Sequence, residues 1–354
     1  MITDDSDEKW KNRLSQWDFN VLDVHCLMAK GSPLECVGWE VIHAHDLVNK
    51  LNLCEERLRK FLRRAESMYD NHNPYHCSAH AGDVTANVHF LLESGIKRAV
   101  SPLEILALFV AAIGHDIGHF ALNNAFLANS KHDIAQRYDY SSSLENFHLQ
   151  QLQDILKDDE CNFLGSVSGE ELKRFHELVS ALVLSTDMAR HRDFFTRFQE
   201  WTQATQKGAD LSLTSTSGDG PCKWFEQTSH AVGEDDRKLL LSMCIKCADL
   251  ANVVKPLSIA DSWAERIMEE FYAQGEREIQ MNLPLTQFSS RENAAWRLAK
   301  HQLSFLTNVV SPLFESFLQL ADSESRALVR DHAEKNTVAW TKRMADLDPG
   351  KGAN

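Results

Sequence analysis

The chain has 354 residues and a formal net charge of −14, and its 15 glycines and 8 prolines are few for this length. Scarce turn residues and recurring helical periodicity exclude a turn-rich sandwich or barrel and predict an all-α protein with a compact multi-helix fold. The negative charge, without any lysine- or arginine-rich block, excludes a nucleic-acid or anionic-membrane partner that depends on a broad basic surface.

No apolar segment approaches the roughly 18–20 residues that a membrane span requires. Eight cysteines are scattered along the chain, and the N-terminus does not resemble a secretory signal. We therefore expect reduced thiols and a cytoplasmic, soluble protein. Cys244 and Cys247 have the spacing of half a zinc site, but no second pair accompanies them. Both lie in an apolar run, where cysteine packs as a small hydrophobic residue.

The sequence predicts one domain rather than two. Residues 1–9 are acidic and aperiodic, so we expect a disordered N-terminus, and residues 346–354 are expected to form a disordered tail. Residues 203–221 are the only low-complexity stretch and predict a flexible surface loop. No internal repeat is present, so residues 10–345 are expected to form a single helical domain.

A histidine pair follows the first clear amphipathic helix. Residues 55–69 place apolar side chains at helical spacing, and Pro74 separates them from a second apolar pattern that begins near Val84. His76 and His80 are four residues apart, which places both on one face of the first turns of this second helix.

The next segment carries two histidines and an aspartate at the end of an apolar run. Ser101 and Glu104 form a capping-box pattern around Pro102, which predicts the start of a buried helix. On that helix His115 and His119 would share a face, with Asp116 about 100° away. Each polar group buried without a partner costs roughly 2–7 kcal/mol, so a divalent metal is the natural compensation. A core histidine bonded to a carbonyl is the alternative, and this segment alone does not decide between them.

The second half of the chain adds carboxylates and an apolar stripe. Glu145 and His148 are three residues apart, a pattern typical of a cap followed by a solvated face. Ser168 and Glu171 form another capping box, which opens a helix that ends near Met188, where a cleft is expected. Asp249 interrupts the apolar helix at residues 238–254. Other side chains follow a core-like periodicity that alone predicts only packing: Trp263, Ile267, Phe271, Gln302 and Phe305.

Taken together, these segments supply imidazoles and carboxylates without thiolates. This donor set argues against a structural cysteine-type zinc and favours a catalytic site with open coordination positions. Two ions that share a carboxylate would activate a water for in-line attack on phosphorus, and a remaining histidine would protonate the leaving oxygen. The chemistry predicted is metal-assisted phosphoester hydrolysis.

Six motifs in order over roughly residues 60–320 resemble the series of class I 3′,5′-cyclic-nucleotide phosphodiesterase catalytic domains. They are Tyr75-His-Cys-Ser-Ala-His-Ala-Gly-Asp-Val84, His115-Asp-Ile-Gly-His119, Leu144-Glu-Asn-Phe-His148, Thr186-Asp-Met188, Cys247-Ala-Asp-Leu-Ala-Asn252 and His301-Gln-Leu-Ser-Phe305. The resemblance implies the family's all-helical catalytic domain and hydrolysis of cAMP, cGMP or both to 5′-monophosphates, a reaction of signal transduction.

The resemblance also implies a metal centre. Four residues would be the ligands of a tightly held Zn²⁺: His80, His115, Asp116 and Asp249. Asp116 would bridge to a second ion, Mg²⁺ or alternatively Mn²⁺, which keeps most of its waters. His119 and Glu145 would hold those waters.

By the same resemblance, His76 would be the general acid that protonates O3′, and Glu270 would position it. Gln302 would hydrogen-bond the edge of the base, and Phe305 would stack on the base opposite Ile267. The remaining substrate contacts would come from Asn252, Tyr75, Phe271 and Met188.

Three positions depart from the family pattern. Cys77 replaces an asparagine, Gly118 replaces an acidic residue and Lys246 replaces a histidine. None is an implied metal ligand, so we expect activity to survive, and we expect Lys246 to extend outward to solvent.

Two other functions remain open at this stage. One is an HD-type metal phosphohydrolase acting on another phosphoester, and the other is a catalytically inactive nucleotide-binding module. The sequence does not choose between cAMP and cGMP, because the Gln302 amide can present either face, and it does not give the oligomeric state.

Overall fold

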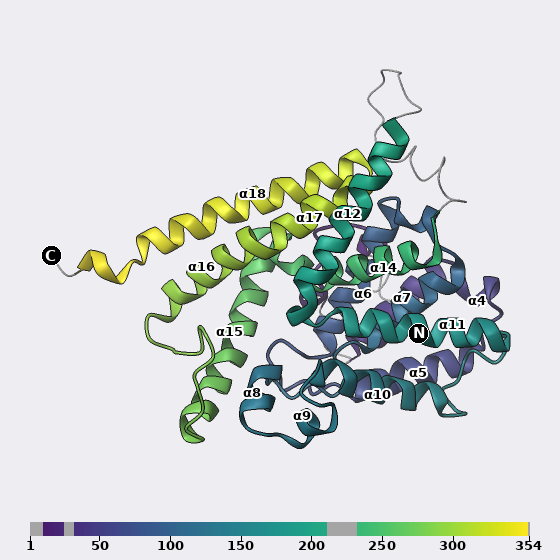
Figure 1. Ribbon diagram of the computed structural model, residues 1–354, viewed down its shortest axis with the longest axis horizontal. Helices are drawn as coiled ribbons and strands as arrows, with labels where there is room; N and C mark the ends of the chain where they lie inside the picture. Colours follow the sequence, from purple (N-terminus) through teal and green to yellow (C-terminus); the bar gives the residue numbers. More distant parts are fainter. Residues whose placement is uncertain (1–9, 25–31, 211–231, 353–354) are drawn as a thin grey trace, which may run out of the picture.

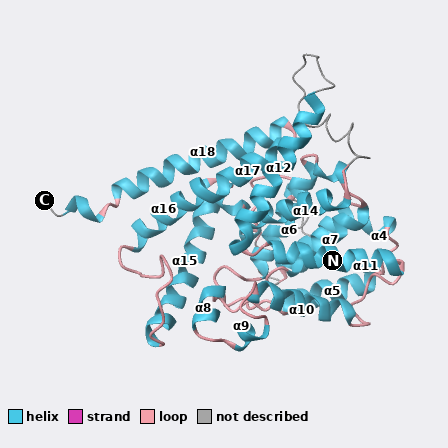
Figure 2. Ribbon diagram, in the orientation of Figure 1, coloured by secondary structure: helices cyan, strands magenta, loops and turns pink. Residues whose placement is uncertain are grey.

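The computed structural model describes residues 10–24, 32–210 and 232–352, and every regular element in these ranges is a helix, as Figures 1 and 2 show. This confirms the all-α prediction. The α-helices are α3 (Pro33–Ala44), α4 (Leu47–Lys50), α5 (Glu55–Ser67), α6 (Ser78–Glu93), α7 (Pro102–Gly114), α8 (Asn124–Asn129), α9 (Asp133–Arg137), α10 (Ser143–Lys157), α11 (Gly169–Ser185), α12 (His191–Asp210), α14 (Glu234–Asp249), α15 (Leu257–Gln280), α16 (Ala294–Phe305), α17 (Ser311–Phe317) and α18 (Ser323–Asp346).

Short helical turns connect these elements. They are η1 (Lys11–Arg13), η2 (Val21–Asp23), η3 (Ile96–Ala99), η4 (Met188–Arg190), η5 (Ala251–Val254), the π-helical η6 (Leu306–Val310), η7 (Leu318–Leu320) and η8 (Pro349–Gly352). None of the helices in the described ranges is both long and apolar enough to cross a membrane.

Three helices, α6, α7 and α14, form the centre of the core. Their apolar side chains point in all directions, so each helix must be covered on every side. Helix α6 packs against α3, α7 and α14, and α11 packs against α7 and α14. The predicted metal-binding residues stand at or just beyond the ends of these central helices, where backbone direction changes and side chains can converge.

Both predicted capping boxes are confirmed. The Ser101 hydroxyl accepts a hydrogen bond from the Glu104 N–H, and the Glu104 carboxylate accepts one from the Ser101 N–H at 2.7 Å. Ser168 and Glu171 make the same reciprocal pair at the start of α11. Each box satisfies two N–H groups that a helix start leaves without partners, which fixes where α7 and α11 begin.

The prediction that His115 and His119 share a helical face is wrong. Helix α7 ends at Gly114, and the chain then turns, with the His119 N–H bonded to the Asp116 carbonyl at 3.0 Å. Gly118 has a φ of +77°, in the left-handed region that favours glycine, and a side chain there would press on the Phe147 ring. The departure at Gly118 therefore fits the turn that returns His119 to the site.

His76 also lies outside the helix on which it was predicted. Helix α6 begins only at Ser78, because the Ser78 N–H and hydroxyl are both held by the Asn71 side chain. The N–H groups of Tyr75 and His76 donate instead to the Glu270 carboxylate, each at 2.8 Å. A long-range contact thus replaces the local helical one.

Helices α15, α16 and α18 form the other side of the molecule, at the left and top of Figure 1. Helix α16 packs against both α15 and α18. The π-helical turn η6 separates α16 from α17, and Pro312 lies in the first turn of α17. Proline has no N–H to bond to the carbonyl four residues earlier, which accounts for the break in the α-helical pattern.

A buried ion pair joins these two sides. Lys255 and Asp83 lie 2.8 Å apart, both side chains are 1% exposed, and the Lys255 ammonium also donates to the Phe19 carbonyl. Asn87 donates to the second Asp83 oxygen, and Asn336 of α18 donates to the Lys255 carbonyl. The network fixes η5 directly after Asp249, the residue that ends α14.

The predicted boundaries need two corrections. Helix α12 continues to Asp210, so residues 203–210 are helical rather than part of a loop, while residues 211–221 lie outside the described residues. The predicted tail is also ordered over residues 346–352, where α18 ends and η8 follows, with the Asp348 carboxylate accepting from the Gly350 N–H. Residues 1–9, 353 and 354 lie outside the described residues.

The close approach of α7 to α10 gives a stability test. A side chain at Gly114 would come within 2.6 Å of the buried Leu152 side chain. We expect Gly114→Ala to lower the free energy of unfolding by about 1–3 kcal/mol, measured by urea denaturation. The reason is that the added methyl group would overlap the fully buried Leu152 side chain.

Gly169 is the matched control, since nothing lies within 4 Å of a side chain added there. Gly169→Ala should leave the stability unchanged or raise it by up to about 1 kcal/mol. Equal stability of the two variants would contradict the packing described for Gly114.

Candidate active site

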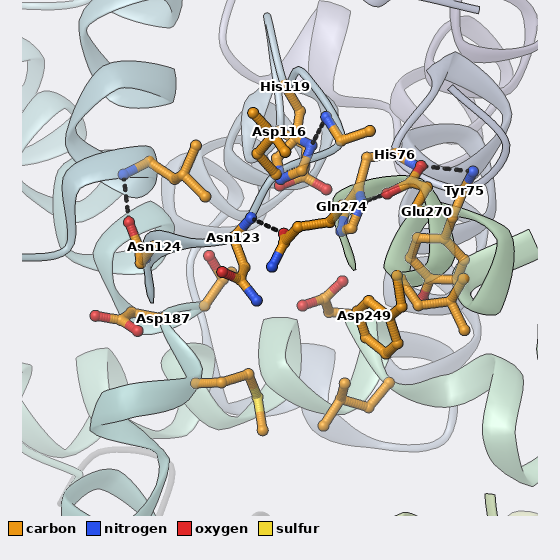
Figure 3. A pocket seen from close by; sticks show the side chains of 18 of the residues that line it. Tyr75, His76, Asp116, His119, Asn123, Asn124, Asp187, Asp249, Glu270 and Gln274 are labelled. Carbon is orange, nitrogen blue, oxygen red and sulfur yellow. Dashed lines mark hydrogen bonds and ion pairs between the residues drawn. The ribbon is translucent and has the colours of Figure 1, made fainter. Parts of the chain in front are cut away.

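A cavity of about 470 Å³ lies between the central helices and the α15–α16 side. Its size is in the range that small-molecule ligands occupy. Of the described residues, those lining it include five carboxylates and no lysine or arginine. The carboxylates are Asp116, Glu145, Asp187, Asp249 and Glu270. Figure 3 shows Asp187 at one end of this pocket and Glu270 at the other.

Four of the predicted residues converge at the floor of the pocket. The His80 Nε2 atom lies 3.1 Å from Asp249 Oδ1 and 3.6 Å from Asp116 Oδ2. The His115 Nε2 atom lies 3.2 Å from Asp116 Oδ2 and 3.4 Å from Asp249 Oδ1. Ligands about 2.1 Å from a tetrahedral ion lie about 3.4 Å apart, close to these distances. The ligand atoms of His80, His115 and Asp249 all lie within 4.8 Å of one another, so these three residues can share one ion, with Asp116 beside them.

The hydrogen bonds of His115 leave one nitrogen available to such an ion. Its Nδ1 atom donates to the Ala112 carbonyl at 2.9 Å, which leaves Nε2 unprotonated in the neutral ring. This Nε2 atom is buried and has no hydrogen-bond partner among the residues that the structure describes. A buried polar atom without a partner is costly, and a metal ion would satisfy it. The residues present therefore fit the implied metal.

His76 and Glu270 form a closely coupled pair. The His76 Nδ1 atom lies 2.5 Å from Glu270 Oε2, and Glu270 also holds the His76 and Tyr75 N–H groups. Burial alone would lower the pKa of His76, but the charge and hydrogen bond of Glu270 outweigh it and raise that pKa to about 9. The ring is therefore protonated at neutral pH, and Nε2 is the nitrogen left to donate to a substrate.

His119 lies against the ring of His76, with the ring centroids 3.9 Å apart. Burial and the neighbouring His76 charge hold the pKa of His119 well below its ordinary value. The His119 Nδ1 atom accepts from the Ala121 N–H at 3.0 Å, so the proton of the neutral ring is on Nε2. Asn73 bonds to the carbonyls of both His76 and His119, which holds the two backbones together.

Glu145 lies in the acidic part of the pocket. Both of its oxygens accept from the Asn124 side chain, at 3.2 and 3.0 Å. Burial and the charge of Asp187 raise the pKa of Glu145 to about 7. A carboxylate with a raised pKa beside further carboxylates marks a place where a bound cation is strongly favoured.

The opposite wall of the pocket is apolar and carries one amide. Ile267, Phe271 and Phe305 line this wall, and Gln302, 3% exposed, lies among them. The Asn252 amide donates to the Tyr75 hydroxyl at 2.8 Å, which joins η5 to the segment before α6. Met188, 41% exposed, lies at the edge of the cavity. All fifteen predicted site residues thus border the cavity or, for His80 and His115, lie directly behind it.

The prediction for Lys246 is wrong. Its side chain is 2% exposed, and its ammonium donates to the Ser185 carbonyl at 2.8 Å. Burial lowers the pKa of Lys246 to about 8, against the opposing attraction of Asp249 and Asp187. A carbonyl at the end of α11 has no helical partner, and bonding to it compensates the buried charge.

Several residues that shape the site were not assigned from the sequence. The sequence singled out His148 only as a neighbour of Glu145, but its Nε2 atom lies 3.9 Å from Asp116 Oδ1. Long-range hydrogen bonds also give a role to Asn73, Asn124 and Gln274, and no local sequence pattern indicates these bonds.

The sequence profile of the 3′5′-cyclic nucleotide phosphodiesterase family matches residues 75–331, which include all of the convergent histidines and carboxylates. The chain belongs to this family. Membership confirms the resemblance of the six motifs.

Individual relatives support the same family. A Drosophila melanogaster 3′,5′-cyclic-AMP phosphodiesterase, isoform F, is 29% identical over 323 residues, which cover 91% of this chain and 46% of that protein. A Mus musculus dual specificity calcium/calmodulin-dependent 3′,5′-cyclic nucleotide phosphodiesterase 1B is 28% identical over 95% of this chain and 58% of that protein. The chain thus spans about half the length of these relatives.

A solved structure shows the same fold. The phosphodiesterase domain of the RhoPDE fusion protein from the choanoflagellate Salpingoeca rosetta superposes with a TM-score of 0.81 at 28% identity. The superposition covers 97% of this chain and 99% of that one. The helical arrangement described above is therefore that of a phosphodiesterase domain.

The pairing of His76 with Glu270 gives a test of the site's electrostatics. In Glu270→Gln the charge and hydrogen bond that most raise the pKa of His76 are gone, while burial still lowers it and Asp116 and Asp249 still raise it. We expect the His76 pKa of the metal-free protein to fall clearly from about 9, measured by NMR titration of the labelled imidazole.

His301 is an internal control in the same spectra, because burial alone lowers its pKa to about 4. Its pKa should not move in Glu270→Gln. An unchanged His76 pKa in this variant would show that Glu270 does not set it.

Proposed function

We propose that this chain hydrolyses 3′,5′-cyclic nucleotides to 5′-nucleoside monophosphates. The observation that carries the proposal is the charge of the pocket, which has five carboxylates and no lysine or arginine among its described lining residues. A phosphate anion can enter such a pocket only with bound cations. His80, His115 and Asp249 place their ligand atoms within 4.8 Å of one another, and Asp116 Oδ2 lies 3.2 Å from His115 Nε2. The apolar wall beside them suits a flat base.

The metals proposed are Zn²⁺ and Mg²⁺, with Mn²⁺ as an alternative second ion. His80, His115, Asp116 and Asp249 would hold the Zn²⁺, and Asp116 would be shared with the second ion. When bound, the two ions supply an activated water and positive charge that stabilises the charge developing on the phosphate. His119 and Glu145 would orient the waters of the second ion.

His76 supplies the proton that the leaving group needs. The Nδ1–H of its protonated ring donates to Glu270, which fixes the orientation of the imidazolium. The Nε2–H then donates its proton to O3′ as the bond between phosphorus and O3′ breaks. A pKa of about 9 keeps this proton in place at neutral pH.

The base would bind between Phe305 and Ile267, with Gln302 bonded to its edge and Asn252, Tyr75, Phe271 and Met188 completing the pocket. Among the described residues, no group forms a hydrogen bond with the Gln302 amide to fix its orientation. Either face of the amide can therefore meet a base, which supports turnover of both cAMP and cGMP.

The domain and its location are also part of the proposal. One large hydrophobic core runs from Trp10 to Trp340, and a small second cluster lies around Phe126. The large shared core supports one catalytic domain over residues 10–345. A cytoplasmic location is proposed from the cysteines scattered through the sequence.

The direct test is an assay of the purified chain with Zn²⁺ and Mg²⁺ on cAMP and cGMP side by side, with chromatographic detection of the 5′-monophosphates. We expect both products, and we expect chelation of the metals to abolish them. Binding without product would favour an inactive nucleotide-binding module. Turnover only of other phosphoesters, unaffected by cyclic nucleotides, would favour a general metal phosphohydrolase.

Replacement of His76 tests the proposed mechanism. A general acid typically contributes about 10²–10⁴-fold to the rate, so we expect His76→Ala to lower kcat by about this factor, while elemental analysis shows unchanged metal content.

His72 is a matched control, because it lies four residues earlier and its side chain is fully exposed. His72→Ala should retain the kcat of the unmodified chain. Full activity of His76→Ala would remove the general-acid role.

A further inference from the structure

A buried hydrogen-bond network leaves the catalytic pocket along α15. Gln274 lies one turn after Glu270 and is 2% exposed. The oxygen of its side-chain amide accepts a hydrogen bond from the Asn123 N–H at 2.9 Å, as drawn in Figure 3. Its amide donates to Glu278 at 2.8 Å and to the Thr286 hydroxyl at 2.9 Å. The function proposed above gives none of these contacts a role.

The same network reaches the proposed site of the second ion from the other direction. The Asn123 side chain accepts from the Phe126 N–H at 2.8 Å and so caps α8. The next residue, Asn124, donates to both oxygens of Glu145 and accepts from the Leu144 N–H at 3.0 Å. Asn124 therefore fixes both the Glu145 carboxylate and the start of α10.

The two parts of this hydrogen-bond network meet in the short segment between His119 and α8. This segment is not helical, and Ala121 has a φ of +55°, so it has no helical ladder of its own to hold it. The bond from the Asn123 N–H to Gln274 ties this segment to α15, the helix that also carries Glu270. A shift of Asn123 would carry Asn124, and with it the Glu145 carboxylate, away from its present position.

A side-chain amide at position 274 can bond to both Asn123 and Glu278. The Asn123 N–H requires an acceptor, whereas the buried Glu278 carboxylate requires a donor, and a glutamine side chain supplies both. Glu278 is 1% exposed, and its other hydrogen bonds come from the Thr286 N–H at 2.7 Å and hydroxyl at 2.6 Å. An apolar side chain at 274 would leave the Asn123 N–H and one bond of Glu278 unmade, at a cost of about 1–3 kcal/mol each.

We propose that Gln274 is a positioning residue for the second divalent cation. Through Asn123 and Asn124 it sets the place of the Glu145 carboxylate, and so the affinity of the pocket for that ion. The inference rests on the proposed function in assigning Glu145 to the water shell of the ion.

The test measures metal binding directly. Mn²⁺ is titrated into the zinc-loaded chain, and free Mn²⁺ is followed by electron paramagnetic resonance. We expect Gln274→Met and Asn124→Ala each to weaken Mn²⁺ binding about tenfold or more, with zinc content unchanged. The double variant should be no weaker than Asn124→Ala alone, because both changes act through one path.

Two further variants separate positioning from general stability. Thr286→Val removes the hydroxyl that donates to Glu278 and accepts from the Gln274 amide. It keeps the bonds of Gln274 to the Asn123 N–H and to Glu278, so Mn²⁺ affinity should be unchanged even if the melting temperature falls. Gln274→Glu keeps an acceptor for the Asn123 N–H, and a proton held between its carboxyl group and that of Glu278 can replace the lost amide donor. It should therefore lose less Mn²⁺ affinity than Gln274→Met. It also provides a variant to measure if Gln274→Met does not fold.

Unchanged Mn²⁺ affinity in both Gln274 variants, or equal weakening in Thr286→Val, would overturn the inference. So would the absence of any second bound ion in the zinc-loaded chain. Failure of the proposed function would look different, because Mn²⁺ binding would respond to Gln274 as expected while neither cyclic nucleotide was hydrolysed.

Discussion

The arrangement of the pocket depends on negative charge that no lysine or arginine among its described lining residues neutralises. Asp116 and Asp249 face the two imidazoles of His80 and His115 at 3.1–3.6 Å, and further carboxylates extend along the pocket toward Asp187. The buried Lys246 is turned toward the Ser185 carbonyl. The net charge of −14 gives no long-range attraction for an anionic substrate. Bound cations would therefore have to supply both the local charge and the attraction for phosphate.

The fold places these groups by ending helices at the site. Helix α7 stops at Gly114, and α14 ends at Asp249, while α6 begins two residues after His76. Glu270 then holds the segment before α6, since it accepts the N–H groups of Tyr75 and His76 and also bonds to the His76 ring. One buried carboxylate thus determines both the backbone before α6 and the protonation of His76.

The sequence predicted those parts of this arrangement that depend on local patterns. The capping boxes at Ser101 and Ser168 were predicted because each needs only neighbouring residues. The termination of α7 was not, because the apolar pattern continues through Gly114 to Ile117 and no local residue signals the end of the helix. The burial of Lys246 depends on a carbonyl that lies 61 positions away in the sequence. The roles of Asn124 and Gln274 depend on hydrogen bonds to residues 21 and 151 positions away. Such contacts leave no periodic signal in the sequence.

The central claim is that a nucleotide enters this pocket only when cations occupy it. Calorimetric titration of a 5′-nucleoside monophosphate, the proposed product, into metal-free and metal-loaded chain tests that claim without relying on turnover. The account predicts clear binding to the loaded protein and binding weaker by at least about a hundredfold, or about 2.7 kcal/mol, to the metal-free protein. Equal affinities in the two states would contradict it.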